Sequence, residues 1–309
     1  MKNYSITSLF SGCGGFDLGF HGGFKFLQKD YARLKFDTVY ANDIDKNACL
    51  TFQKNFQKNI ICSDVNKLDI TALEKSDIVI GGFPCQDFSY AGKRLGFDSD
   101  RGNLYKSMCN IVKHIKPKLF LAENVKGLLT IDGGNAIKTI IKDFEYLGYN
   151  IAYKLLKVSD FGVSQKRERV IIIGTRKDVL PQFNFDDIGG SKACDVYNVI
   201  KDLENYDEGH VDNHKWSKAK MNNGQGNTVI NKNEFAPTMR AEHHGNIEFH
   251  YNGNRRLSAR EAARIQSFPD DFIFYPSTSS AYKQIGNAVP PVFAWHIAKS
   301  IQKFLDSSL

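Results

Sequence analysis

Residues 4–20, YSITSLFSGCGGFDLGF, decide the fold. Residues 4–10 alternate and end in apolar side chains, which predicts a strand. A Gly-x-Gly-Gly loop follows, and a helical pattern comes next. Because glycine lets the backbone approach a ligand closely, this order is typical of a nucleotide-type loop. The spacing differs from the G-x-G-x-x-G fingerprint, and glycine-rich turns after strands are common. A plain tight turn therefore stays open on these residues alone.

Polar residues also end the next two expected strands. Thr38–Ala41 leads into Asn42-Asp43-Ile44-Asp45, and Asn59–Cys62 leads into Ser63-Asp64-Val65. An acidic residue at the tip of the second strand can accept hydrogen bonds from ribose hydroxyls, and we assign this role to Asp43. Ile44 is placed to pack on a base, and Asp45 is expected to cap the following helix. These strand tips predict a cofactor cleft at the carboxyl edge of a parallel sheet.

A single cysteine follows the fourth expected strand. Asp77–Ile80 is apolar, Gly81-Gly82-Phe83-Pro84 ends it abruptly, and Cys85 and Gln86 come next. Residues 87–101 then show neither helix nor strand periodicity. A thiol at a strand end beside such a loop suggests a nucleophile under a lid. Because free cysteines are often buried, Cys85 is equally well explained as a small core residue at this point.

Charged groups follow the fifth strand and precede the last one. Lys118–Ala122 reads as a buried strand and delivers Glu123 to the edge that holds Cys85. A buried structural carboxylate is the alternative for Glu123. Residues 165–169, Gln-Lys-Arg-Glu-Arg, lie between two expected strands, 150–158 and 169–175. Such runs are usually solvated turns, but arginines near Cys85 and Glu123 would bind phosphate or stiffen the site.

Helices are expected over 104–114, 135–147 and 292–305, and a capping box formed by Ser258 and Glu261 starts another. Periodicity fades over 181–253, which predicts a small, loop-rich second domain. Within it, residues 236–246 mix hydrogen-bonding and cationic side chains suited to reading base edges. The adjacent His243 and His244 lack a third spaced ligand, so no metal site is expected.

Composition narrows the class of protein. The chain has 309 residues, 42% hydrophobic and 24% charged, which suits one large globular domain or two unequal ones. The net charge of +7 permits a polyanionic partner without establishing one. Apolar runs are only strand-length, the N-terminus shows no secretory signal, and the six cysteines form no C-x-x-C pair. We therefore expect a protein of the reducing cytoplasm, without membrane span, disulfide framework or zinc site.

Together these blocks resemble the cytosine-C5 DNA methyltransferases of bacterial restriction–modification systems. The resemblance covers almost all of the chain outside about 181–254, and the blocks stand in the family's order. Single blocks are weakly specific, whereas the ordered set is highly specific and makes Cys85 a nucleophile. The blocks that carry it are residues 11–19, Asn42-Asp43, Ser63-Asp64, Pro84-Cys85-Gln86, Glu123-Asn124-Val125, residues 165–169, residues 255–272 and Gly286-Asn287.

The family implies an α/β fold: a Rossmann-like, mostly parallel sheet with one antiparallel strand and a small loop-rich target-recognition domain. The expected division is 1–180 with 284–309 for catalysis and cofactor, 181–254 for target recognition, and 255–283 as the connection. The implied cofactor is S-adenosylmethionine. Its pocket maps onto Phe10, Ser11, Gly12, Cys13, Gly14, Gly15, Asp43, Ile44, Asp64, Val65, Pro84, Asn287 and Ala288. Asp43 stands where many members carry Glu.

The implied chemistry uses Cys85, Glu123, Arg167 and Arg169. A thiolate added at C6 of cytosine makes C5 nucleophilic, and a nearby arginine such as Arg167 would raise the thiolate fraction of a thiol whose ordinary pKa is ~8.5. A protonated Glu123 can donate to N3 while an arginine holds O2. The target base must be flipped out of the duplex. Closure of residues 87–101, with Gly92 and Gly96 as hinges, would cover it.

Double-stranded DNA is the implied partner of a monomeric enzyme, and a cognate restriction endonuclease would act separately. The expected DNA contacts are Gln86, Ser89, Lys93, Arg101, Gln165, Thr238, Arg240, His243, His244 and Asn246. The segment 238–246 resembles one in methyltransferases that read GG…CC-type palindromes. A Rossmann oxidoreductase would leave Cys85 and Glu123 unexplained, and a non-catalytic DNA-binding protein would not need Cys85. A transfer-RNA cytosine methyltransferase shares the catalytic set, whereas a domain at 181–254 favours duplex DNA.

Overall fold

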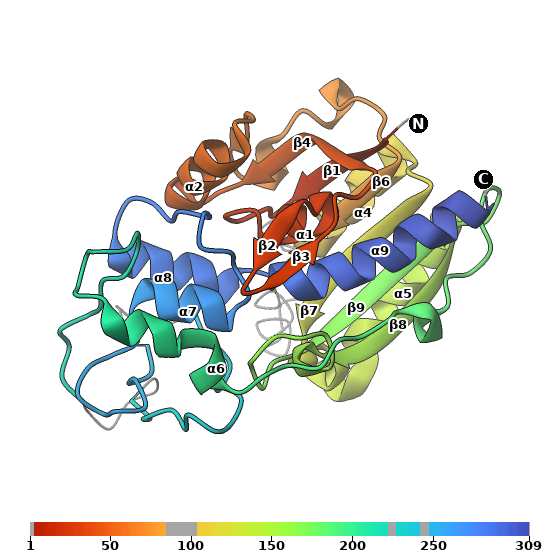
Figure 1. The fold of residues 1–309 in the computed structure, drawn as a ribbon. Coiled ribbons are helices and arrows are strands. Elements are labelled where there is room, and N and C mark those ends of the chain that lie inside the picture. The colour runs from red at the N-terminus through yellow and green to blue at the C-terminus, as the bar shows by residue number, and fades with distance from the viewer. Residues whose placement is uncertain (1–2, 85–103, 222–226, 242–246, 309) are drawn as a thin grey trace.

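The computed structural model describes residues 3–84, 104–221, 227–241 and 247–308. Within them, seven strands form one sheet in the order β5-β4-β1-β6-β7-β9-β8 (Figure 1). β9 pairs antiparallel with both neighbours, and the other pairs are parallel. The expected parallel sheet with one antiparallel strand is confirmed. The strands are β1 Tyr4–Leu9, β4 Phe36–Asp43, β5 Ile61–Cys62, β6 Ile78–Gly81, β7 Leu119–Val125, β8 Tyr149–Lys157 and β9 Glu168–Arg176.

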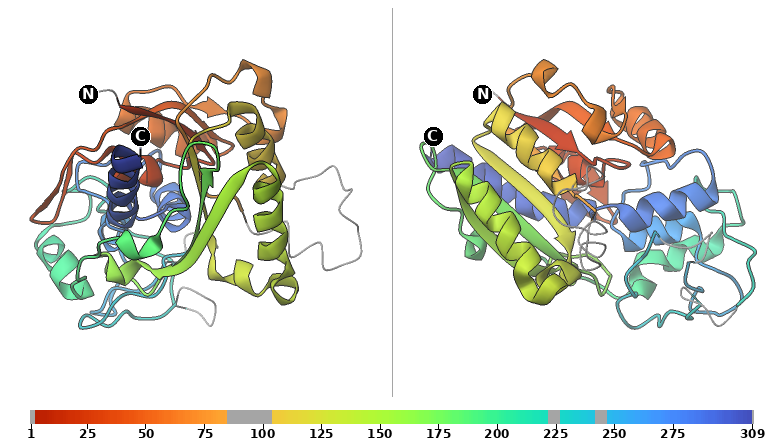
Figure 2. Two further views of the ribbon diagram at one scale, coloured as in Figure 1. Left: turned by 90° about the vertical axis from the view of Figure 1, so that its right-hand side faces the viewer. Right: turned by 180° about the vertical axis from the view of Figure 1, so that it is seen from behind.

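The sheet is apolar on both faces, as expected where helices cover both sides of parallel strands. Successive side chains point to opposite faces, so Phe120 and Ala122 of β7 pack under helices α4 (Leu104–Ile115) and α5 (Asn135–Tyr146). Figure 2 shows these two helices side by side on the face turned away in Figure 1. Leu119 and Leu121 enter the core on the opposite face.

That opposite face is covered by α1 (Gly15–His21) and the long α9 (Pro291–Ser308), which pack against each other. The C-terminal helix therefore closes the layer begun by the N-terminal one (Figure 1). Helix α2 (Lys46–Phe56) lies beside β4, and its N-cap is Asp45, as predicted. The hairpin β2 (Phe24–Phe26) and β3 (Lys29–Tyr31) was not expected from the sequence. Its apolar residues pack near α9, where Tyr31 meets Trp295 edge to face at 5.2 Å.

The described chain between β9 and α9 holds little regular structure, which the fading periodicity predicts for residues 181–253. It contains α6 (Val196–Ile200), α7 (Ala259–Ile265) and α8 (Thr278–Asn287), which gather away from the sheet (Figure 1). Helix α8 was not expected. Its apolar side chains join the core cluster that also includes α1 and α9. The 3-10 turns of the described chain are Val65–Lys67, Ile70–Ala72, Lys126–Leu129, Ile131–Gly134, Val158–Asp160, Phe185–Asp187 and Lys201–Asn205.

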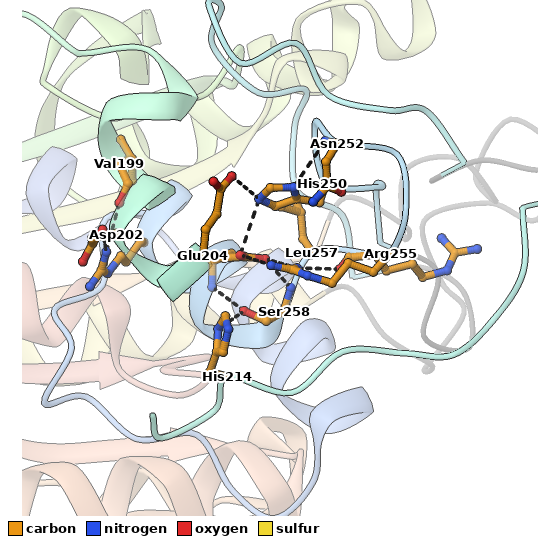
Figure 3. A network of polar contacts seen from close by, with 12 residues as sticks. Val199, Asp202, Glu204, His214, His250, Asn252, Arg255, Leu257 and Ser258 are labelled. Carbon is orange, nitrogen blue, oxygen red and sulfur yellow. Dashed lines mark hydrogen bonds and ion pairs between the residues drawn. The ribbon is translucent and has the colours of Figure 1, made fainter. Parts of the chain in front are cut away.

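A buried polar network holds the start of α7 (Figure 3). The predicted capping box is present: Ser258 Oγ accepts from Glu261 N at 3.0 Å, and Glu261 Oε2 accepts from Ser258 N at 2.7 Å. Both oxygens of the buried Glu261 also accept from Arg255 at 2.7 Å. His214 Nδ1 lies 3.0 Å from Ser258 Oγ, and His250 Nε2 lies 3.6 Å from Glu261 Oε1. The carboxylate thus serves both as a helix cap and as a buried counter-ion.

No helix of the described residues is both long and apolar enough to cross a membrane.

Candidate active site

The sheet changes direction between β1 and β6. From β1 the chain builds outward through β4 and β5, and it then returns to start the other half at β6. Parallel sheets bind ligands at such a switch point, outside the carboxyl ends of the strands. A cavity of about 410 Å³ opens there, lined by the ends of β1, β4, β6 and β7 and by the end of α8. This volume lies within the ordinary range for small-molecule sites.

The predicted cofactor residues converge on this cavity. Twelve of the thirteen line it, and the exception is Gly14, which is instead the N-cap of α1. Glu123, Arg167 and Arg169 line the same cavity, so the structure brings the described members of the predicted catalytic set to the cofactor residues. The twelve are Phe10, Ser11, Gly12, Cys13, Gly15, Asp43, Ile44, Asp64, Val65, Pro84, Asn287 and Ala288.

Asp43 joins the glycine loop to the tip of β4. Its Oδ2 accepts from Gly12 N at 2.7 Å, and its Oδ1 accepts from Asp45 N at 2.8 Å. Burial is the largest influence on this carboxyl group and raises its pKa, which these backbone bonds oppose. Each carboxylate oxygen has a second lone pair, so Asp43 can still accept from a ligand hydroxyl. Asp45 accepts from Lys283 Nζ at 2.6 Å, which fastens α8 across the rim of the cavity.

The sequence did not predict the buried polar network that lies beneath the glycine loop. Asp17 of α1 is fully buried and accepts from Ser8 Oγ at 2.9 Å and Thr38 Oγ1 at 2.8 Å. Ser11 Oγ donates in turn to Ser8, and Asn42 fixes the neighbouring strand end by donating to two carbonyls. Burial raises the pKa of Asp17 to about 6. Local patterns do not reveal such a network, because its members lie on three separate elements.

Glu123 pairs with Arg169 at the end of β7. Arg169 Nε lies 2.7 Å from Glu123 Oε1, and both side chains are almost buried. The Nε–H does not point at that oxygen, so the contact is an ion pair rather than a hydrogen bond. A Cβ at Gly82 would lie 3.1 Å from Glu123 Oε2, which places the carboxylate directly over the chain that leads to Pro84 and Cys85. Because residue 82 is glycine, no side chain competes with the Glu123 carboxylate for that space.

The neighbouring Asn124 holds the same chain from the other side. Its Nδ2 donates to Phe83 O at 2.9 Å, and its Oδ1 accepts from Val125 N at 2.8 Å. Asn124 is buried, so this amide fixes the path of the backbone before Cys85. The sequence marked Asn124 only as part of a motif, and the structure assigns it this positioning contact.

Arg167 has a different environment from Arg169. It is 2% exposed, and its two terminal nitrogens donate to the carbonyls of Met239, Gly286 and Ala288 at 3.0–3.2 Å. Burial, and then the charge of Arg169, lower its pKa. Of the two predicted arginines, Arg169 therefore pairs with the Glu123 carboxylate, whereas Arg167 donates hydrogen bonds to backbone carbonyls.

The predicted DNA contacts divide into three groups. Gln165 is fully buried and bonded to Gln266 and Met239 N, so the expectation of a DNA contact does not fit its position. Thr238 is half-buried and donates to Lys166 O at 2.9 Å, and Arg240 is exposed.

Metal-binding groups of three or more ligands do not occur among the described residues. Outside the described residues lie Cys85, Gln86, Ser89, Lys93, Arg101, His243, His244 and Asn246.

Comparison with known families decides the class of this protein. The profile of the C-5 cytosine-specific DNA methylases matches residues 4–240 and 193–303. The chain belongs to this family. A family member is a DNA cytosine-C5 methyltransferase, which agrees with the resemblance that the sequence blocks show.

Two curated relatives match along nearly their whole length. The type II methyltransferase M.FnuDI of Fusobacterium nucleatum is 38% identical over 97% of this chain and 94% of its own. M.NgoPII of Neisseria gonorrhoeae is 35% identical over 97% and 96%. A solved E. coli prophage structure, titled a putative DNA modification methyltransferase, has a TM-score of 0.74 at 22% identity, covering 98% of this chain and all of that one. S. pombe Dnmt2 has a TM-score of 0.69 at 16% identity, covering 99% of each chain. These structures support the fold.

Proposed function

We propose that this methyltransferase moves a methyl group from S-adenosylmethionine to C5 of one cytosine in a short duplex DNA site. The observation that carries the proposal is the shared cavity. A nucleoside-type cleft and the Glu123–Arg169 pair open into it, and Pro84, the residue before Cys85 in the sequence, forms part of its wall. A cofactor cleft alone would suit many enzymes, whereas this pair beside a cysteine suits addition to a pyrimidine ring.

The cavity fits S-adenosylmethionine by its side chains. The side chain of Ile44 is 69% exposed at the cavity rim. A flat base that packs on it would remove this apolar surface from water, which is favourable for binding. Asp43 presents carboxylate oxygens with free lone pairs for ribose hydroxyls. Asp64 adds a second carboxyl group, which favours a cationic ligand. When bound, S-adenosylmethionine supplies an electrophilic methyl group.

The protein side chains then activate the cytosine. Cys85 thiolate adds to C6, which makes C5 nucleophilic. The addition places negative charge on N3 and O2, where Glu123, in its protonated form, donates to N3 and Arg169 offers its guanidinium to O2. After methyl transfer, loss of the C5 proton, return of the N3 proton to Glu123 and cleavage of the C6–S bond restore the Cys85 thiolate. Asn124 positions the chain before Cys85, and Arg167 supports the site through backbone contacts rather than by touching the base.

The relatives support a role in protecting DNA. Their names identify them as type II methyltransferases, and this chain matches nearly the full length of the two described above. We infer that the methylated site is one that a separate restriction endonuclease would otherwise cut. The net charge of +7 favours association with DNA.

A methyl-transfer assay tests the proposal. Labelled S-adenosylmethionine is offered with duplex DNA and, separately, with transfer RNA. Label should enter DNA with the wild type and with Cys194→Ser, a control thiol away from the cavity, and not with Cys85→Ser. Bisulfite sequencing of DNA from an expressing strain then identifies the cytosine. Activity on transfer RNA alone would refute the proposal for DNA, and full activity of Cys85→Ser would refute the covalent step.

Two further measurements separate the roles. A duplex with 5-fluorocytosine in the target position should trap a covalent adduct on the wild type, seen as a mass increase of the protein. Asp43→Ala should mainly raise the KM for S-adenosylmethionine, because Asp43 lies in the cofactor cleft. An equal loss of DNA affinity would contradict that assignment.

A further inference from the structure

Residues 236–241, here called the target strap, carry two of the predicted DNA contacts and lie along residues 164–167. Lys166 N donates to Ala236 O at 2.7 Å, and Ala236 N donates to Ser164 O at 3.0 Å. Thr238 Oγ1 adds a bond to Lys166 O at 2.9 Å. The strap is therefore fastened to the segment that contains Arg167, although the two are about seventy positions apart in the sequence.

Met239 is the point where the strap is held most firmly. Its N–H donates to Gln165 Oε1 at 3.0 Å, and its carbonyl accepts from Arg167 at 3.0 Å. Met239 is itself 1% exposed. Both polar groups of this residue thus end on side chains of the 164–167 segment, and neither is left to water.

The same side chains also hold the cavity rim. Arg167 donates to Gly286 O and Ala288 O. Gln165 Nε2 donates to Gln266 Oε1, and Gln266 Nε2 donates to Ala288 O at 2.7 Å and Ile285 O at 3.0 Å. Gly286 and Ala288 line the cofactor cavity. Two parallel routes of hydrogen bonds therefore run from the strap to the rim, one through Arg167 and one through the glutamine pair.

Direct packing adds a third connection. A Cβ on Gly286 would lie 2.3 Å from Ala241 N and 2.3 Å from the carbonyl carbon of Arg240. Real Cβ atoms do not approach backbone so closely, so only glycine lets the strap rest against the rim. The backbone of the strap that bears Arg240 is therefore in contact with the cavity wall.

Burial makes this connection stiff. Gln165 and Gln266 are fully buried, and Arg167 is 2% exposed, so water cannot replace a broken bond. Leaving a buried donor or acceptor unpaired costs more than the bond itself contributes. The strap and the rim are thus expected to shift together or not at all.

We propose that Arg167 and Gln266 are positioning residues that couple reading of the DNA target at the strap to cofactor binding at the rim. The inference rests on the proposed function for the identity of the two ligands. Because coupling between binding sites is reciprocal, cofactor bound at the rim orders the strap by the same factor as target DNA tightens cofactor binding. A typical coupling would be about 5-fold or more.

Hydrogen–deuterium exchange on the full chain tests the coupling without DNA. S-adenosylhomocysteine is the ligand, its binding is measured first by calorimetry, and exchange is read in peptides that cover 236–241. Arg167→Lys keeps the charge but loses the fork that reaches three carbonyls. Arg260→Lys is the matched control. Arg260 is also buried and donates to three carbonyls, those of Asp212, Pro269 and Phe272, none of which belongs to the strap or the rim.

Ligand should slow exchange of the strap about 5-fold or more in the wild type and in Arg260→Lys, and not in Arg167→Lys. Gln266→Met, which removes the other route at similar volume, should also reduce the protection and serves if Arg167→Lys fails to fold. Binding without protection of the strap would overturn the coupling and leave the proposed function intact. Full protection retained in both Arg167→Lys and Gln266→Met would likewise overturn it. Absence of ligand binding in the wild type would overturn both.

Discussion

The sheet region and the loop-rich region around α6 and α7 are stabilised by different means. In the sheet region, strands pair their own backbone groups, and apolar side chains such as Phe120 fill both faces. In the loop-rich region, buried arginines bind backbone carbonyls. Arg256 donates to the carbonyls of residues 219, 220 and 247, and Arg260 donates to three others.

The difference follows from the supply of hydrogen-bond donors. Regular strands and helices pair each carbonyl with an N–H, whereas irregular buried backbone leaves carbonyls unpaired. Arginine carries five N–H donors and no acceptor, so one side chain can satisfy several carbonyls. The loop-rich region thus satisfies much of its buried backbone with arginine side chains, whereas the sheet region pairs its backbone mainly within its strands. Four predictions test this division, from the largest expected effect to the smallest.

Glu123→Gln should lower methyl transfer about 10²–10⁴-fold, because it removes a proton donor while keeping the size of the side chain. The urea midpoint of unfolding should fall as well, because the almost buried Arg169 loses its counter-ion, so activity is measured where both proteins are fully folded. Steady-state transfer to duplex DNA and urea titration measure the two effects. Glu168→Gln is the control, since Glu168 forms an exposed ion pair with Lys126 in the same part of the sheet. A similar loss of activity in Glu168→Gln would show that charge near this edge, rather than Glu123 itself, is responsible.

Glu261→Ala should destabilise the protein by about 3–5 kcal/mol, because it leaves the largely buried Arg255 without its counter-ion and removes the Glu261 half of the capping box. The free energy of unfolding from urea titration measures this. Glu208→Gln breaks the more exposed pair with Lys218 and should cost about 1 kcal/mol or less. Equal effects of the two changes would contradict the role given to buried charge.

Phe120→Leu should cost about 1–3 kcal/mol, because the ring of Phe120 stacks on Phe144 at 4.1 Å and meets Tyr149 edge to face at 5.2 Å. Added salt should not alter this loss, whereas salt should reduce the loss seen for Glu208→Gln. Tyr146→Leu is the control, since Tyr146 is 92% exposed. A salt-dependent effect of Phe120→Leu would weaken the contrast between the two regions.

Because of His21, the free energy of unfolding should fall as the pH is lowered into the mildly acid range. Burial, and then Arg33, lower its pKa from 6.5 to about 3, so its contribution is full above pH 6.5 and is lost as pH falls toward 3. From pH 6.5 to 5.5 the loss is about 1 kcal/mol. Asp17 opposes it, because its raised pKa favours the folded state as pH falls through about 6. Urea midpoints of the wild type and His21→Gln at both pH values should show a weaker fall in the variant.

Local patterns predicted the elements that bear strong periodicity or caps. The strands β1, β4, β6, β7, β8 and β9 and the helices α4, α5 and α9 occur where expected, mostly within a few residues. The capping box at Ser258 and the cap at Asp45 are confirmed. The expected third strand is reduced to the two residues of β5, and the hairpin β2–β3 and helix α8 were missed. These short elements owe their form to packing partners distant in sequence, such as Trp295 against Tyr31.

The sequence by itself determined the family and the convergence of strand tips, because each motif follows a strand and parallel strands end at one edge. The tertiary structure alone separated Arg167 from Arg169, and it turned Gln165 inward. Two residues apart, the arginines carry the same charge and resemble one another in any local pattern. Their tasks differ because Arg169 meets Glu123 from the neighbouring strand, whereas Arg167 meets carbonyls brought from positions 239, 286 and 288. Such partners depend on how distant segments pack, which no local pattern encodes.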